Sequence, residues 1–149
     1  LALIRRDILH LPGPDPEKCA VAALYHDASE ILTGDMPTPI KYYNPEIRNA
    51  YKAVEKVAGE KLLDMLPQEL RESYRDYVLE SDRELEPIVK AADKLAAHIK
   101  CIEELKAGNS EFSTAASQTL EALRGAHREE LDWFLDHCLE PFSRDLDQL

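Results

Sequence analysis

Residues 25–39 are the segment around which the rest of the chain is organised, and they read YHDASEILTGDMPTP. Successive residues of an α-helix are about 100° apart on a helical wheel, which places His26, Asp27 and Glu30 within roughly 100° of one another. Apolar residues occupy the other side of the wheel, namely Val21, Leu24, Tyr25, Ala28, Ile31 and Leu32. We therefore expect a helix with one face in the core and the opposite face available for chemistry.

A short loop follows this helix. Gly34 is the residue expected to adopt a positive φ at the helix end. The X-Pro steps Met36-Pro37 and Thr38-Pro39 hold the next residues extended. Such a stiff loop can present Asp35 and a hydroxyl to a small polar ligand. The same residue types also favour ordinary turns, so the residues alone leave both interpretations open.

The remaining chain reads as a series of helices bounded by Pro, Gly, Asn and Asp. Apolar spacing and caps predict helices at residues 1–8, 15–32, 44–65, 67–79, 84–106 and 110–139. In the fifth of these the expected core stripe is Ile88, Ala92, Leu95, Ile99 and Ile102. No segment has a convincing strand pattern, so the predicted fold class is all-α.

Composition limits the classes of function. The 149 residues carry a net charge of −11, which argues against binding polymeric nucleic acid through a basic face. No apolar run is long enough to span a membrane, and no signal-peptide pattern is present. The three cysteines, Cys19, Cys101 and Cys138, form no CxxC pair or disulfide framework. We therefore expect one globular domain in the cytoplasm.

Three residues are candidates for metal binding. A neutral imidazole and a carboxylate suit Zn, Mn, Fe or Co, so adjacent His26 and Asp27 can hold one cation, and Glu30 on the same side strengthens this interpretation. A polar pair on a helix is otherwise simply solvated. Asp93 lies about 140° from the core stripe of its helix. It is either an exposed aspartate or, because small side chains surround it, a late ligand beside a closely packed helix.

The chain resembles the HD-domain metal-dependent phosphohydrolases, and is most similar to the bacterial 5′-deoxynucleotidases among them. The resemblance rests on residues 25–42, 89–93, 100–105 and 107–112. It implies a single HD-domain helical bundle over residues 1–149, with one divalent metal ion (Co, Mn, Zn, Cu or Fe) held by His26, Asp27 and Asp93. Glu30 becomes the catalytic carboxylate.

The same resemblance implies a substrate and an assembly. The substrate is a deoxyribonucleoside 5′-monophosphate, contacted by Asp27 and Asp93 and by a nucleotide loop consisting of Asp35, Met36, Pro37 and Thr38. Asp35 lies near the sugar and matters for turnover. The protein is expected to be a homodimer.

The chain departs from the family pattern in one respect. The family's first metal ligand is an early His, and an Arg-Trp pair in the same region contacts substrate, but neither is matched here. We expect both in an N-terminal segment that precedes residue 1. Two alternatives to a 5′-deoxynucleotidase remain: an HD phosphohydrolase for another nucleotide, such as a triphosphate or signalling nucleotide, and a catalytically inactive helical binding module.

Overall fold

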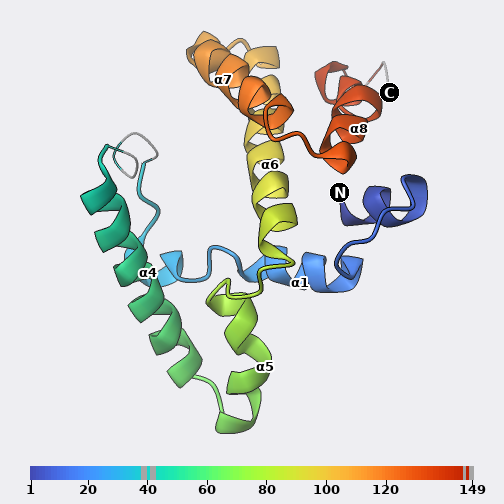
Figure 1. Cartoon of the computed structure of the whole chain (residues 1–149). Coiled ribbons are helices and arrows are strands. Elements are labelled where there is room, and N and C mark those ends of the chain that lie inside the picture. The colour runs from blue at the N-terminus through green and yellow to red at the C-terminus, as the bar shows by residue number, and fades with distance from the viewer. Residues whose placement is uncertain (38–39, 41–42, 146, 148–149) are drawn as a thin grey trace. The chain divides into compact units, whose positions relative to one another are not determined.

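The computed structural model (Figure 1) describes residues 1–37, 40, 43–145 and 147. These residues contain helices and no strand, so the predicted all-α class is confirmed for the described part of the chain. In order, the elements are η1 (Ile4–Ile8), α1 (Pro16–Tyr25), α2 (Glu30–Thr33), α4 (Pro45–Asp64), α5 (Gln68–Val78), α6 (Glu86–Lys106), η2 (Ser110–Phe112), α7 (Ser113–Arg124), α8 (Glu129–His137) and η3 (Glu140–Ser143). None of these helices combines the length and apolarity that crossing a bilayer requires, as far as the described residues extend.

The chain forms two compact units. Unit 1 comprises Leu1–Cys19 and Pro87–Leu149, and unit 2 comprises the intervening Ala20–Glu86. The polypeptide passes from one unit to the other within α1 and again at the start of α6. The expectation of one HD domain over residues 1–149 stays a prediction.

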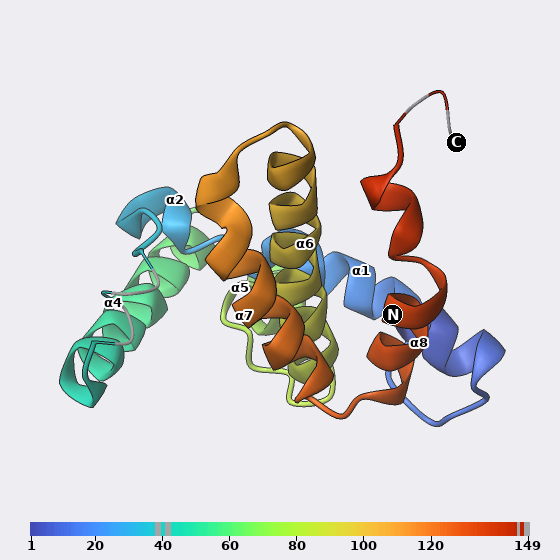
Figure 2. The ribbon, with the colours of Figure 1, turned by 90° about the horizontal axis from the view of Figure 1, so that it is seen from above.

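Unit 1 is built on α6, with α7 running alongside it (Figure 2). Its core cluster consists of Ala91, Leu95, Leu123, Leu131 and Leu135. The buried side of α6 differs from the expected stripe: Ala91, His98 and Cys101 are buried, whereas Ala92, Ile99 and Ile102 are only half-buried. The pitch was predicted correctly, but the stripe is rotated by about one residue because α6 turns that side toward the leucines of α7 and α8.

The predicted helix over residues 110–139 is wrong, because it is divided into η2, α7 and α8. On one straight helix, Leu123 and Leu135 would lie about 18 Å apart along the axis and could not join one cluster. The chain instead stops α7 at Gly125 and reverses through His127, whose φ is +49°. The break brings Leu131 and Leu135, which are 0% and 6% exposed, back onto Leu123.

A buried ion cluster joins η1 to α8. Glu130 is 0% exposed and accepts hydrogen bonds from Arg128 Nε at 2.7 Å and from Arg5 Nη1 at 2.9 Å. Arg5 also donates through Nε to the carbonyl of Pro12 at 2.7 Å. A Cβ at Gly13 would lie 2.8 Å from Arg5 Nε, so a larger residue there would require the Arg5 side chain to shift. The first residues of the chain are thereby fixed to its last long helix.

Unit 2 contains a hairpin of α4 and α5, which lie side by side in Figure 1. Asn44 caps α4 as predicted, accepting from the backbone N–H of Ile47 at 2.8 Å. Gly59 allows the close approach of the two helices, since a Cβ there would lie 2.8 Å from Leu79 Cδ2. Arg75 of α5 also reaches Glu60 of α4, with a shortest distance of 3.0 Å.

The expected continuous helix over residues 15–32 is wrong as well. Asp15 does cap its start, accepting from the backbone N–H of Glu17 at 2.7 Å. The helix is nevertheless interrupted, since α1 ends at Tyr25 and α2 begins at Glu30. The turn between them shifts the angular positions of the following side chains relative to those on a continuous helix. Two residues after the turn that were assigned to the core face are consequently exposed, Ile31 at 76% and Leu32 at 46%; Leu24, which lies in α1 before the turn, is 81% exposed as well.

Candidate active site

The His-Asp pair lies in the turn between α1 and α2 rather than on a helix. Backbone bonds of three-residue spacing form this turn: Ala28 N–H donates to Tyr25 O and Glu30 N–H donates to Asp27 O, each at 2.9 Å. Ser29, which precedes α2, is only 8% exposed. The turn pairs His26 with Asp27 and links the Glu30 N–H to the Asp27 carbonyl, whereas the expected clustering of all three side chains on one face stays a prediction.

Hydrogen bonding orients the His26 ring. Nδ1 lies 2.8 Å from the carbonyl oxygen of Ala23. A carbonyl oxygen can only accept, so Nδ1 carries a proton and donates it to Ala23. Nε2 lies 2.9 Å from Asp27 Oδ2 and is shielded from solvent. A ring nitrogen and a carboxylate oxygen thus face each other at a distance that suits an Nε2–H···Oδ2 hydrogen bond, and both are atoms that can also bind a cation.

This pair fits half of a metal site. Ligating histidines usually donate their second ring N–H to a carbonyl or carboxylate, as His26 does to Ala23, and the carboxylate supplies a hard oxygen ligand. Within the described residues, no group of three or more His, Cys, Asp or Glu side chains is placed to hold a metal ion. Asp93 belongs to unit 1, where it is exposed on α6. The three-ligand set of His26, Asp27 and Asp93 thus stays a prediction.

An aromatic contact anchors the end of α1 that leads into the pair. The rings of Tyr25 and Tyr74 of α5 meet edge to face, with centroids 5.5 Å apart and planes at 87°. A hydrogen bond with Tyr74, reinforced by the Coulomb interaction with the same group, raises the pKa of Tyr25. The residue before His26 is thereby tied to the α4–α5 hairpin.

The predicted catalytic and nucleotide-loop residues continue from this turn. Glu30 is half-buried at the first position of α2, and Asp35 is exposed directly after Gly34. Met36 is half-buried and Pro37 is exposed. Thr38, the last residue of the predicted loop, lies outside the described residues. The roles of all five residues stay predictions.

One residue near the loop was not predicted to take part in the site. Tyr51 of α4 is 8% exposed and donates its hydroxyl to the carbonyl of Gly34 at 2.6 Å. From the sequence, Tyr51 was only one of the residues of the helix predicted over 44–65. A signal was available, because a buried tyrosine hydroxyl usually finds a hydrogen-bond partner.

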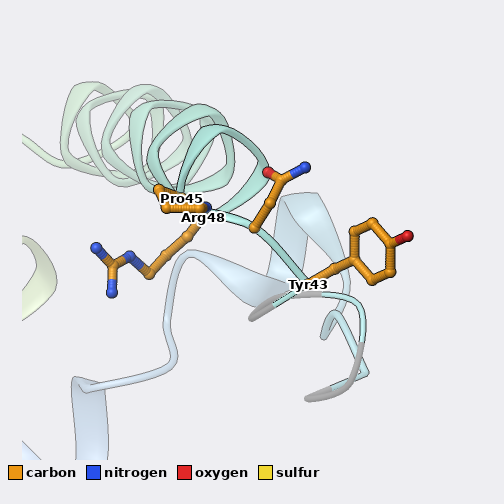
Figure 3. Close-up of a pocket in the computed structure, with 4 residues that line it drawn as sticks. Tyr43, Pro45 and Arg48 are labelled. Atoms are coloured by element: carbon orange, nitrogen blue, oxygen red, sulfur yellow. The ribbon is translucent and has the colours of Figure 1, made fainter.

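A small pocket at the start of α4 does not have the form of a nucleotide site. Tyr43, Asn44, Pro45 and Arg48 line it, and its volume is about 150 Å³. Small-molecule sites usually measure about 300–1,000 Å³. In Figure 3 the side chains of Tyr43 and Arg48 extend in different directions and do not converge on a common point. We therefore do not assign the substrate to this pocket.

An all-α fold with adjacent His26 and Asp27 in a turn between two helices has the features of the HD class of phosphohydrolases. A family model described as 5′-deoxynucleotidase YfbR-like matches residues 1–142. The chain belongs to this YfbR-like family.

Curated relatives agree with this assignment. A 5′-deoxynucleotidase of Pectobacterium atrosepticum is 49% identical over 138 residues, covering 89% of this chain and 68% of the relative. The corresponding protein of Vibrio cholerae is 47% identical over 137 residues, covering 91% of this chain and 71% of the relative. The 5′-deoxynucleotidase YfbR of Escherichia coli is 46% identical over 136 residues, covering 89% and 68% respectively.

Proposed function

We propose that this protein is a metal-dependent 5′-deoxynucleotidase that hydrolyses deoxyribonucleoside 5′-monophosphates to a deoxynucleoside and phosphate. The observation that carries the proposal is the His26–Asp27 pair, whose Nε2 and Oδ2 atoms face each other at 2.9 Å in a chain of the YfbR-like family. Relatives with 46–49% identity carry the name 5′-deoxynucleotidase, which supports a nucleotide monoester as substrate.

The proposed metal ligands are His26, Asp27 and Asp93, and the ion is divalent. Such an ion supplies charge neutralisation for the phosphoryl group and a hydroxide-like nucleophile near neutral pH. Ala23 orients His26 by accepting a hydrogen bond from Nδ1, which leaves Nε2 on the side of Asp27 for the proposed ion. Asp27 and Asp93 are also proposed to contact the substrate.

Two further carboxylates complete the proposal. Glu30 moves a proton, either from the attacking water or to the departing 5′ oxygen. Its position one turn from Asp27, whose carbonyl accepts the Glu30 N–H, supports this role. Asp35 and residues 36–38 hold the deoxyribose, which gives the loop after α2 the task of sugar recognition.

Phosphate release from a nucleotide panel tests this function. The purified protein is assayed with added Mn²⁺ or Co²⁺ against deoxyribonucleoside and ribonucleoside 5′-monophosphates, triphosphates and cyclic nucleotides. We expect hydrolysis of the deoxyribonucleoside monophosphates above all others. A preference for triphosphates or cyclic nucleotides would assign the chain to another HD phosphohydrolase activity. Binding without hydrolysis of any nucleotide would favour an inactive binding module.

We also propose that the protein works as a homodimer in the cytoplasm. Large apolar side chains such as Leu24, Val54 and Val57 are exposed and could supply a self-association surface. The three cysteines, Cys19, Cys101 and Cys138, form no CxxC pair or dense framework, which suits a reducing compartment. Light scattering after size exclusion tests the first statement, and fractionation of the source cell tests the second.

A further inference from the structure

The hydroxyl of Tyr51 belongs to a hydrogen-bond network around the peptide group that leads into Asp35. It donates to the carbonyl of Gly34 at 2.6 Å. Thr33 Oγ1 donates to the same oxygen at 2.9 Å and lies 3.5 Å from the Tyr51 hydroxyl. Since the Gly34 carbonyl and the Asp35 N–H form one planar group, these donors fix the plane from which Asp35 departs.

Few other features fix the orientation of the peptide group between Gly34 and Asp35. Gly34 has φ = 70° and ψ = 162°, a conformation that is essentially restricted to glycine. No heavy atom lies within 4 Å of a Cβ built there. Asp35 is exposed, so its direction depends on the backbone that carries it. Tyr51, in contrast, is 8% exposed within α4 and provides a rigid point of attachment.

We propose that Tyr51 is a positioning residue that sets the orientation of Asp35 and thereby the discrimination between deoxyribose and ribose. The inference rests on the proposed function, in which the loop after α2 holds the sugar. Tyr51 acts through the Gly34 carbonyl. All of its partners in this network lie in unit 2.

The test compares Tyr51→Phe with Tyr77→Phe. The first variant keeps the buried ring and removes the donor, and the second makes the same chemical change in α5 of the same unit. We expect Tyr51→Phe to lower kcat/KM for a deoxyribonucleoside 5′-monophosphate about tenfold, the effect of one lost hydrogen bond. The preference over the matching ribonucleotide should narrow to a similar extent. Tyr77→Phe should change neither quantity.

Hydrogen exchange provides a readout that does not depend on activity. The N–H groups of Thr33 and Gly34 donate to the carbonyls of Ser29 and Glu30, at 3.2 and 2.9 Å. Tyr51→Phe should accelerate exchange of these two amides about tenfold relative to Tyr77→Phe, because the end of α2 loses its attachment. If wild-type protein hydrolyses no deoxyribonucleotide, the proposed function fails, and the exchange rates still decide whether Tyr51 holds the loop.

Two results would overturn the inference: unchanged exchange at Thr33 and Gly34 in Tyr51→Phe, or an unchanged sugar preference in an active enzyme. A fall in kcat/KM that is equal for both sugars would also count against it, because a merely structural defect acts on both. Should Tyr51→Phe fail to fold, Thr33→Val removes the second donor to the same carbonyl. It is expected to narrow the sugar preference in the same direction.

Discussion

Replacing Glu130 by alanine should destabilise unit 1 by about 3 kcal/mol, because the change leaves two arginines without their shared buried carboxylate. The wild-type carboxylate is 0% exposed and accepts from Arg128 Nε at 2.7 Å and from Arg5 Nη1 at 2.9 Å. Breaking a buried ion pair usually costs about 3–5 kcal/mol. The Arg5 and Arg128 side chains are each 25% exposed, so water offsets part of the loss and the lower end applies. The equilibrium constant for unfolding should rise about 140-fold.

Trp133 makes this measurement specific to unit 1. It is the single tryptophan of the chain and lies in α8, the helix that carries Glu130. Urea titration at pH 7, followed by the fluorescence of Trp133, should show the loss of about 3 kcal/mol in the free energy of unfolding for Glu130→Ala. Glu130→Gln keeps the volume and one acceptor oxygen, so its loss should be about half as large. The matched control is Glu129→Ala, since Glu129 is exposed and carries the same charge. Equal midpoints for Glu130→Ala and Glu129→Ala would refute the reasoning.

The same cluster predicts a dependence on pH. Burial opposes ionisation of Glu130, but hydrogen bonds from its own backbone N–H, Arg128 and Arg5 outweigh burial, and the pKa of this carboxyl lies below its ordinary value of 4.5. Its contribution to stability is present above pH 4.5 and is lost as the pH falls through the lowered folded-state pKa. The stability difference between wild type and Glu130→Gln should therefore shrink on acidification below that value.

Three further changes test the site and unit 1. Asp27→Ala should abolish metal retention and hydrolysis while helicity is preserved. The control Asp64→Ala, at an exposed aspartate of the same unit, should leave metal retention and hydrolysis unchanged. Metal analysis, the phosphate-release assay and circular dichroism measure the three quantities. Glu30→Gln should retain the metal but lower kcat about 10²–10⁴-fold, and near-normal turnover would reassign Glu30 to structure. Burial lowers the pKa of His98 below its ordinary 6.5, outweighing a hydrogen bond to the backbone of Ala116. Stability measured by fluorescence should thus fall as the pH drops from 6.5 to that lowered pKa and then level off, and His98→Gln should flatten this slope.

The sequence predicted the features that local chemistry controls. Asp15 and Asn44 were recognised as helix caps because their side chains can accept neighbouring backbone N–H groups, and both do so in the structure. Gly34 was expected to take a positive φ, and its φ is 70°. The pairing of His26 with Asp27 followed from their adjacency alone. These features involve residues only a few positions apart, so they can be predicted from the local sequence.

The sequence failed where distant residues decide the backbone. The helix break at residues 26–29 removes Ile31 and Leu32 from the expected core face, and no Pro or Gly marks it. The break after Arg124 depends on returning Leu131 to a cluster with Leu123, a contact that helical periodicity cannot foresee. The role of Tyr51 was not predicted, because its partner Gly34 lies 17 residues earlier. Wheel and cap arguments reach about one helix turn, and these contacts exceed that reach.

The bond between Arg5 and Glu130 can form only late in the synthesis of the chain. Its partners are 125 residues apart in the chain. At translation rates of about 5–20 residues per second, about 6–25 s pass between the synthesis of Arg5 and the synthesis of Glu130. The whole of residues 20–86 is translated during that interval. Residues 20–86, which include His26 and Asp27, can thus begin to fold before Arg5 can bind Glu130 of α8.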